Sequence, residues 1–351
     1  MNKKLGLLKE IHVEGFKSIK KMDLELKPLN IIIGANGAGK SNFIDVFKMI
    51  RTYKEGNLER YVKSAGGANR LLHLGTKETK EIRAGIYFGK KNMRYCIDLK
   101  WDERDAFYGS AEETGHINEQ GIDFHLSQAF EQRLASFRCF HFNDTTNSSP
   151  LKQGKLLVGD NIYLQEDGGN LASILYKLKK SEKLHGYYDR IVSAIQIIAP
   201  YFDDFVLEPD GRYLSLRWKQ KNSDVLFEAF DFSDGTIRFI ALATLLMTPL
   251  NMMPDTILID EPELGLHPLA LKILAEMMQA AARQGKQVIA TTQSVTLINQ
   301  FAPEDIIVAD RKDSQSVFRR LDEKEIKDWL DEYALGEIWE KDIIGGTPDE
   351  F

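Results

Sequence analysis

Cysteines and long hydrophobic runs are scarce in this sequence. Its 351 residues include two cysteines, Cys96 and Cys139, and neither belongs to a CxxC pair. This excludes a disulfide scaffold, a structural zinc site and a redox pair, and it predicts a reducing, cytoplasmic setting. The longest apolar run, Phe239–Leu246, is far shorter than the roughly 20 residues of a membrane span. Charges also interrupt the apolar stretch within Met1–Glu10 before it reaches signal-peptide length, so we expect neither secretion nor a membrane partner.

Internal repeats and sustained heptads are also missing, which argues against a long coiled-coil arm. The net charge of −6 hides an asymmetry, because residues 1–100 carry 21 Lys and Arg against 10 Asp and Glu, whereas residues 321–351 carry 3 against 11. Either region is a solvated surface or a patch for a partner, and DNA is a possible partner of the basic one. The basic residues considered for DNA are Lys63, Arg70, Lys77, Lys80 and Arg83.

A glycine-rich loop follows the first buried strand that the sequence predicts. Leu29–Ile33 is a short apolar run of mostly β-branched residues, and Phe43–Ile50 has helical spacing of its apolar positions. Between them the chain matches the phosphate-binding pattern G-x-x-x-x-G-K-[ST]. The residues of this loop are Gly34, Ala35, Asn36, Gly37, Ala38, Gly39, Lys40 and Ser41. Its backbone N–H groups and the following helix N-terminus favour phosphate binding, although a simple glycine-rich turn is the alternative.

The side chains of this loop predict an ATP site with Mg²⁺. Lys40 would reach the β- and γ-phosphates, Ser41 would ligate Mg²⁺, and Asn42 follows in the nucleotide-binding set. The acidic residues of this ATP site are expected after the strand Thr256–Ile259. There, Asp260 would serve Mg²⁺ and Glu261 would orient the hydrolytic water, unless the two acids form only a helix-capping turn.

The remaining periodicities predict an α/β chain. The helix Pro268–Arg283 between two apolar strands is typical of a parallel sheet, and residues 60–125 favour an antiparallel meander. Expected strands are Arg83–Phe88, Arg94–Leu99, Tyr213–Trp218, Val225–Phe230, Gln287–Thr291 and Asp305–Ala309. Expected helices are Leu171–Leu178, Ile191–Ile198 and Gly235–Met247.

The order of further motifs resembles that of ABC-type ATPases. After the phosphate loop come Phe232–Thr236, the acidic pair followed by Glu263–Pro268, and Thr291–Ser294 after the next strand. Together with Val13–Ile19 and a tail Tyr333–Pro348 that contains Gly345-Gly346, the chain resembles the RecF/SMC-like branch, in particular stand-alone bacterial "AAA domain" ATPases.

This resemblance implies a single two-lobed ATPase head. Residues 1–145 and 250–320 would form the nucleotide-binding lobe with a mixed or parallel core sheet, carrying an antiparallel β subdomain at about 60–125. Residues 146–249 would form the helical signature lobe, and residues 321–351 an acidic C-terminal tail.

The resemblance also implies a composite site. Ser233 and Gly235 would cap the γ-phosphate of a nucleotide bound by the other subunit of a head-to-tail homodimer, although a plain helix N-cap is the alternative. Gln293 stands where such enzymes commonly have a histidine, which predicts slow or partner-dependent turnover. Asn143, in His141–Thr145, is the candidate for the loop that approaches Mg²⁺ and water, and His267 is expected to cap a helix or contact the dimer partner.

We therefore expect an ATP-hydrolysing switch or scaffold that assembles through ATP as a homodimer or a higher oligomer and serves DNA or a separate effector protein such as a nuclease. Antiphage defence and DNA repair are the roles implied by the resemblance. The alternative is a nucleotide-stabilised interaction scaffold with little turnover. A transporter motor is disfavoured, because the start and the tail of the chain do not resemble transporter ATPases.

Overall fold

The computed structural model describes residues 5–89, 93–114, 124–153, 156–157 and 162–347. The chain divides into two compact units: residues 1–138 with 287–351, and residues 139–286. The sequence assigns 250–320 to the nucleotide-binding lobe, whereas 250–286 are compact with the second unit, so the lobe boundaries stay a prediction. Pro348, the last residue of the predicted tail motif, and residues 115–123 of the predicted meander lie outside the described residues.

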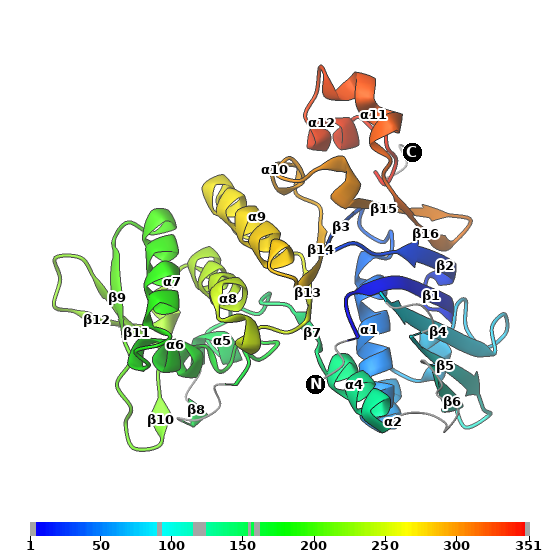
Figure 1. The fold of residues 1–351 in the computed structure, drawn as a ribbon, viewed down its shortest axis with the longest axis horizontal. Coiled ribbons are helices and arrows are strands. Elements are labelled where there is room, and N and C mark those ends of the chain that lie inside the picture. The colour runs from blue at the N-terminus through cyan, green and yellow to red at the C-terminus, as the bar shows by residue number, and fades with distance from the viewer. Residues whose placement is uncertain (1–4, 90–92, 115–123, 154–155, 158–161, 348–351) are drawn as a thin grey trace. The chain divides into compact units, whose positions relative to one another are not determined.

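An antiparallel sheet forms one part of the first unit (Figure 1). Its strand order is β2 (Ile19–Glu25), β1 (Leu8–Phe16), β4 (Glu81–Phe88), β5 (Arg94–Trp101) and β6 (Phe107–Thr114). The alternation of buried and exposed side chains in β4 and β5 has the period of two that the sequence predicted there. The expected meander is therefore confirmed for the described residues from 81 to 114, whereas residues 124 and 125 belong to the helix α4 (Phe124–Ala135).

The first part of the expected meander is wrong. Residues before β4 form two short helices, α2 (Leu58–Ser64) and α3 (Ala68–Leu71). In α2, Tyr61 and Val62 are buried three and four residues after Leu58, which is helical spacing.

A second sheet of the first unit holds β3 (Leu29–Ile33) between two parallel neighbours, β14 (Gln287–Thr292) and β15 (Ile306–Lys312). The hairpin strand β16 (Gln315–Arg320) pairs antiparallel with β15. All residues of β3 and β14 are buried, as expected for apolar strands of a parallel sheet. The predicted strand Leu29–Ile33 is confirmed with the same bounds.

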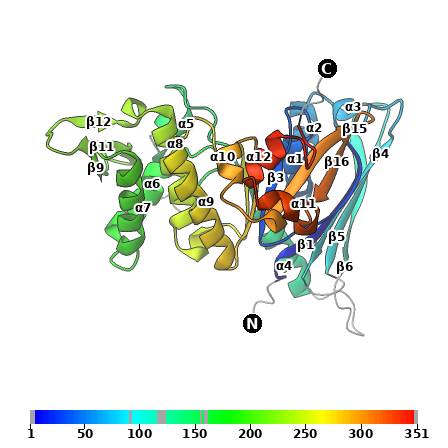
Figure 2. The ribbon, with the colours of Figure 1, turned by 90° about the horizontal axis from the view of Figure 1, so that it is seen from above.

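Helices complete the first unit. The helix α1 (Lys40–Lys54) follows the glycine loop and buries Phe43, Val46, Phe47 and Ile50, the apolar face that the sequence predicted. Near the C-terminal end, α12 (Leu335–Glu340) packs on α10 (Val295–Ile298), and the two views show them side by side (Figures 1 and 2). The other elements are α4 (Phe124–Ala135), α10 (Val295–Ile298), η3 (Pro303–Asp305), α11 (Glu323–Leu330) and α12 (Leu335–Glu340).

The second unit is mainly helical, and β7 (Phe137–Phe140) leads into it. Its helices are α5 (Pro150–Gln153), α6 (Leu171–Lys180), α7 (His185–Ile198), η1 (Ala229–Asp231), α8 (Asp234–Met247), η2 (Leu250–Met252) and α9 (Pro268–Arg283). Its strands are β8 (Leu156–Leu157), β9 (Phe202–Val206), β10 (Tyr213–Leu214), β11 (Arg217–Gln220), β12 (Leu226–Glu228) and β13 (Thr256–Asp260). The predicted helices are confirmed, and α9 has the predicted bounds.

Packing in the second unit centres on α8, which contacts α6, α7 and α9. Aromatic rings close one side of the small sheet β12-β11-β9, where Trp218 stacks at 4.6 Å on Phe227 and at 4.4 Å on Phe232. Phe232 directly precedes Ser233, so this stacking fixes the chain at the entry to α8. Within the described part of the chain, no helix has the length and hydropathy that crossing a membrane requires.

Candidate nucleotide-binding site

The glycine loop curves tightly between β3 and α1. Gly39 has φ 106°, in the left-handed region that favours glycine, and a Cβ there would collide with the Ser316 hydroxyl. Asn36 and Gly37 are exposed at the outer side of the loop, whereas Ala38, Gly39 and Lys40 are buried. The loop therefore has the strand, turn and helix arrangement that a phosphate-binding loop requires.

The Lys40 side chain is held inside this loop. It is 5% exposed, and its Nζ donates to the carbonyl oxygens of Gly34 at 2.7 Å and Ala35 at 2.9 Å. These contacts keep an ammonium group inside the loop that leads into α1. A concentration of positive charge at this point suits a bound anion.

The N-terminus of α1 fits a phosphate group. No acidic residue lies in its first turn, and no side chain caps it. Most helices satisfy these N–H groups with a capping side chain, and an anion does the same. Ser41 is exposed at the first turn, which suits a hydroxyl ligand of Mg²⁺. The residues present thus fit a nucleotide with its metal ion.

Two hydroxyl groups, to which the sequence assigned no role, contact residues at the phosphate loop and the start of α1. The Asn42 amide donates to Ser18 Oγ at 2.7 Å, and the Ser316 hydroxyl is 2.6 Å from the same oxygen. The predicted nucleotide residue Asn42 is thus bonded to the β1–β2 turn. Arg311, also missed, donates to the carbonyl oxygen of Gly37 at 3.3 Å and adds a cation at the mouth of the loop.

Gln293 belongs to the same unit as the phosphate loop. It follows β14, which pairs with β3 so that Thr292 lies opposite Ile33, the last residue before the loop. Its side chain is half-buried, and the next residue, Ser294, caps α10 by accepting from the Leu297 N–H at 3.2 Å. Parallel pairing therefore puts the end of β14 beside the start of the phosphate loop, as an ABC-type arrangement requires.

The acidic pair ends β13 in the second unit. Asp260 and Glu261 are half-buried, and Glu261 has φ 48°, a left-handed conformation that costs a non-glycine residue about 1–2 kcal/mol. The alternative was that the two acids form only a helix-capping turn. They do not cap α9, because its N-cap is His267, whose Nδ1 accepts from the Leu269 N–H at 3.3 Å. His267 thus has the capping role that was one of its two expected roles.

The signature residues begin α8. Ser233 is exposed and its Oγ accepts from the Thr236 N–H at 3.1 Å, so the N-cap alternative is realised in this structure. Gly235 is required by close packing, since a Cβ there would collide with the Gly265 carbonyl oxygen. An exposed hydroxyl at a helix N-terminus remains available to a ligand from outside the unit.

A buried arginine organises the loops around α8, and sequence reasoning missed it. Arg238 is 6% exposed, and its Nε donates to the Phe142 carbonyl oxygen at 2.9 Å. Its two terminal nitrogens donate to the carbonyl oxygens of Leu264 and, at 3.4 Å, of Asn143. The available signal was a lone cation among the apolar residues that begin α8. Asn143 itself is exposed, on a loop that Arg238 fixes.

The predicted site residues are thus divided between the units. The phosphate loop and Gln293 belong to the first unit, and Asp260, Glu261, Ser233 and Asn143 to the second. Within the second unit, Arg238 brings the Asn143 loop and the loop after the acidic pair to one side chain. The roles assigned to these residues stay predictions.

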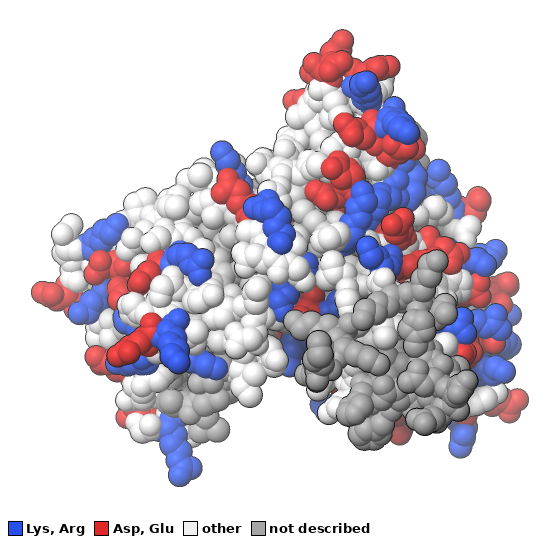
Figure 3. All heavy atoms as spheres, in the orientation of Figure 1, with Lys and Arg blue, Asp and Glu red and all other residues white. Residues whose placement is uncertain are grey.

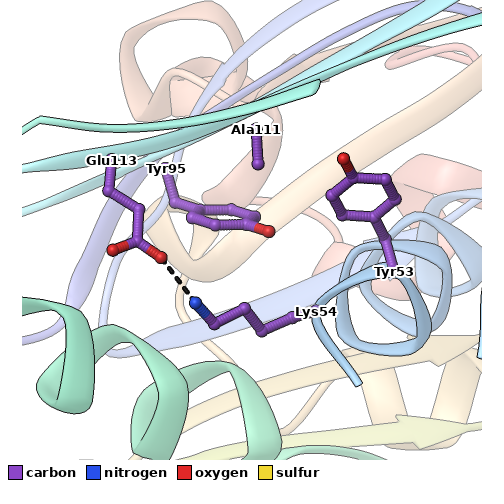
Figure 4. Close-up of a pocket in the computed structure, with 5 residues that line it drawn as sticks. All are labelled: Tyr53, Lys54, Tyr95, Ala111 and Glu113. Atoms are coloured by element: carbon purple, nitrogen blue, oxygen red, sulfur yellow. Dashed lines mark hydrogen bonds and ion pairs between the residues drawn. The ribbon is translucent and has the colours of Figure 1, made fainter. Parts of the chain in front are cut away.

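A separate pocket lies between α1 and the strands β5 and β6 (Figure 4). The Lys54 ammonium forms an ion pair with Glu113 at 2.6 Å and lies 5.8 Å from the centre of the Tyr95 ring. None of the predicted site residues lines this pocket. Because Glu113 already neutralises the cation, the pocket offers no unbalanced positive charge for phosphate groups.

Comparison with known proteins points to the same class. The family described as "AAA domain, putative AbiEii toxin, Type IV TA system" matches residues 29–299, from the first residue of β3 to the residue after α10. The chain is 21% identical over 364 residues to the OLD nuclease of Thermus scotoductus, covering 94% of this chain and 68% of that protein. It is 23% identical over 351 residues to the Old nuclease of Escherichia phage P2, covering 83% of this chain and 57% of that protein.

Solved structures confirm the fold. The Smc head domain of Pyrococcus furiosus, solved with the C-terminal domain of ScpA, matches with a TM-score of 0.63 at 18% identity, covering 93% of this chain and 98% of the other. The predicted α/β fold of an ABC-type head is therefore correct. This level of identity supports the fold and not the partner.

Proposed function

The chain belongs to this AAA domain family and is an ABC-type P-loop ATPase of the RecF/SMC-like class, and from this premise we propose that it binds ATP with Mg²⁺ and hydrolyses the ATP. The observation that carries the proposal is the phosphate loop. Lys40 is buried inside it, and the uncapped N-terminus of α1 follows directly. Both features favour an anion with several negative charges over a neutral ligand.

The residues have distinct roles in this proposal. The loop from Gly34 to Gly39 and the side chain of Lys40 bind the phosphates, while Ser41 and Asp260 hold Mg²⁺. Bound Mg²⁺ would neutralise charge that develops on the phosphate oxygens. Glu261 orients the attacking water and accepts its proton, and Gln293 donates a hydrogen bond toward the γ-phosphate.

A head-to-tail homodimer completes the site. The exposed Ser233 and the start of α8 would cap the nucleotide that the partner subunit holds. ATP then joins two subunits, and its hydrolysis releases them, which makes the protein a switch or scaffold. Because two of its relatives are named nucleases, we propose an associated nuclease activity, supplied by an effector protein, in antiphage defence or DNA repair.

A second candidate function is an interaction scaffold that binds ATP and turns it over little. Gln293 favours it, because glutamine has no titratable proton near neutral pH. Phosphate release by the wild-type protein separates the two functions. Turnover that stays at background with ATP, Mg²⁺ and a partner present supports the scaffold.

The first test compares Lys40→Ala and Glu261→Gln with the wild type. Lys40→Ala removes the cation of the loop, and we expect ATP affinity to fall by at least about 100-fold, or 2.7 kcal/mol. Glu261→Gln removes only the group that orients water, so it should still bind ATP and accumulate as a dimer. Titration calorimetry gives the affinities, and light scattering after size-exclusion chromatography gives the mass.

Two outcomes contradict the proposal. Wild-type affinity for ATP in Lys40→Ala would place the nucleotide elsewhere, and a monomeric Glu261→Gln at saturating ATP and Mg²⁺ would reject the ATP-linked dimer. Lys54→Ala is a matched control, since this lysine lies at the other end of α1 and pairs with Glu113. It should bind ATP like the wild type.

A further inference from the structure

The chain near its C-terminal end contacts the phosphate loop and also α10, the helix that follows Gln293. This C-terminal segment, residues 335–346, begins with α12 and ends with the Gly345-Gly346 pair. It is firmly packed, since Ile338, Trp339 and Ile344 are each less than 10% exposed. Arg319 of β16 also donates to the carbonyl oxygen of Ile344 at 2.7 Å.

One end of the segment is bonded to the phosphate loop. The Ala35 N–H donates to the Gly346 carbonyl oxygen at 2.6 Å. The carbonyl oxygen of the same residue, Ala35, accepts from Lys40 at 2.9 Å. The position of Gly346 therefore helps to set the position of a carbonyl that holds the Lys40 ammonium.

Gly346 fits this place because it lacks a side chain. It is buried, with φ 80°, and a Cβ would lie 2.9 Å from Val308 Cγ1, 3.1 Å from the Ala309 carbonyl oxygen and 3.5 Å from Gly34 Cα. The neighbouring Gly345 has a similar φ of 71°, but there the nearest atom to a Cβ would be Asp310 Oδ2 at 3.7 Å. The contact requirement is thus specific to Gly346.

The other end of the segment is bonded to α10, the helix that follows Gln293. The Gly336 N–H donates to Asn299 Oδ1 at 2.6 Å. A Cβ at Gly336 would lie 2.7 Å from the Val295 carbonyl oxygen in the first turn of α10. One end of the segment therefore approaches the strand β15 beside the phosphate loop, and the other approaches α10, so closely that only glycine fits.

We propose that the C-terminal segment positions the phosphate loop and the Gln293 loop relative to each other, with Gly346 and Gly336 as its positioning residues. Neither glycine touches the nucleotide. A shift of the phosphate loop when ATP binds is transmitted through Ala35 and Gly346 to α12, and from Gly336 and Asn299 to α10. This inference rests on the proposed ATP binding at the loop and adds the element that couples its two sides.

The test compares Gly346→Ala with Gly345→Ala as a matched control. Both variants strain a residue with positive φ by a similar amount, but only Gly346→Ala forces a new methyl group against Val308 and Ala309 of β15. We expect ATP affinity to fall about tenfold in Gly346→Ala relative to Gly345→Ala. Titration calorimetry with ATP and Mg²⁺ on the full chain measures this difference.

Hydrogen exchange tests the coupling itself. In the wild type, ATP should slow amide exchange in both 34–41 and 295–299. Asn299→Ala removes the acceptor of the Gly336 N–H, and we expect it to keep ATP-dependent protection at 34–41 but lose it at 295–299. If the segment served only stability, Asn299→Ala would lower the midpoint of unfolding but would not separate the ATP-dependent protection at 34–41 from that at 295–299.

The outcomes are distinguishable. Failure of the wild type to bind ATP would reject the proposed function itself. Binding by the wild type with equal affinities in the Gly346→Ala and Gly345→Ala variants would overturn the positioning role. If Gly346→Ala does not fold, the exchange data on Asn299→Ala decide, and retained protection at 295–299 overturns the proposal.

Discussion

At the scale of single residues, Arg238 connects two loops of the second unit, although no motif contains it as a functional residue. Burial lowers the pKa of its guanidinium, and the nearby Asp234 carboxylate opposes this. The side chain remains charged, because the ordinary pKa of arginine is so high. Its charge is satisfied by carbonyl oxygens of Phe142, Asn143 and Leu264. The two loops that hold these carbonyls are thus fixed by one side chain.

We predict that Arg238→Met loosens both loops. Methionine keeps much of the buried volume but leaves carbonyl oxygens without a donor, which costs roughly 2–4 kcal/mol of unfolding free energy. Hydrogen exchange should become faster at residues 141–145 and 263–266. The exposed Arg212→Met is the control and should change neither stability nor exchange. Unchanged exchange at both loops would show that Arg238 does not hold them.

The local structure of a motif and the chemistry of its residues could be predicted from the sequence. The hydrogen bonds and contacts between residues that are distant in the sequence could not. Gly34 to Ser41 forms the expected loop because its glycines and lysine specify a local structure. The role of Ser316 behind Gly39, and of Gly346 beside Ala35, depends on residues that are remote in sequence. Spacing alone contains no sign of such pairs.

At the scale of elements, local pattern decided which predictions were correct. The strand Leu29–Ile33 and the helix Pro268–Arg283 each keep one pattern of apolar residues along their length and are bounded by proline or glycine. Both are confirmed. The strand β1 was not predicted, because a register shift between Leu8 and Glu10 interrupts its period of two. Such a bulge is set by pairing with β4, which lies far along the chain.

The N-terminus of α8 gives a prediction about pH. Lys152 of α5, whose side chain is 6% exposed, donates to Asp234 in the first turn of α8 at 2.8 Å. This hydrogen bond is the main cause of a lowered pKa of the Asp234 carboxyl. A lowered folded-state pKa stabilises the fold above the unfolded-state pKa of about 4, and the contribution is lost as pH falls through the folded value.

We therefore expect the difference in unfolding free energy between wild type and Asp234→Asn to be constant from about pH 8 to 5 and to shrink below about pH 4. Asp234 is 62% exposed, so solvent screening keeps the difference under about 1 kcal/mol. Urea unfolding at a series of pH values measures it. The exposed pair Glu59 and Lys63 supplies the control substitution Glu59→Gln, which should have a smaller effect. A difference that grows toward low pH would contradict this account.

At the scale of the whole molecule, charges of opposite sign lie close together in regions where the sequence has blocks of one sign. Acidic side chains gather over α11 and α12, but basic side chains lie among them (Figure 3). In the basic first hundred residues, Arg83 forms ion pairs with Glu14, Glu81 and Asp98 at 3.6, 2.6 and 3.6 Å. Lys63 is paired with Glu59 at 2.6 Å. Cations that already have acidic partners contribute less to binding a phosphate backbone.

This pairing gives a quantitative prediction for DNA. If all five basic residues singled out in the sequence contacted phosphates, the logarithm of the binding constant would fall against the logarithm of salt concentration with a slope of about −4.5. With Arg83 and Lys63 neutralised by carboxylates, three contacts remain, and the expected slope is about −2.7. Fluorescence anisotropy with duplex DNA, ATP and Mg²⁺ over a salt series measures it.

The variants Arg83→Gln and Lys77→Gln separate paired from unpaired cations. Arg83→Gln should leave the slope near the wild-type value, whereas Lys77→Gln, whose cation is exposed, should make it shallower by about 0.9. A wild-type slope near −4.5, with an equal loss from both variants, would mean that DNA displaces the carboxylates from Arg83. No binding at low salt with ATP present would remove DNA from the proposed partners and leave an effector protein as the proposed partner.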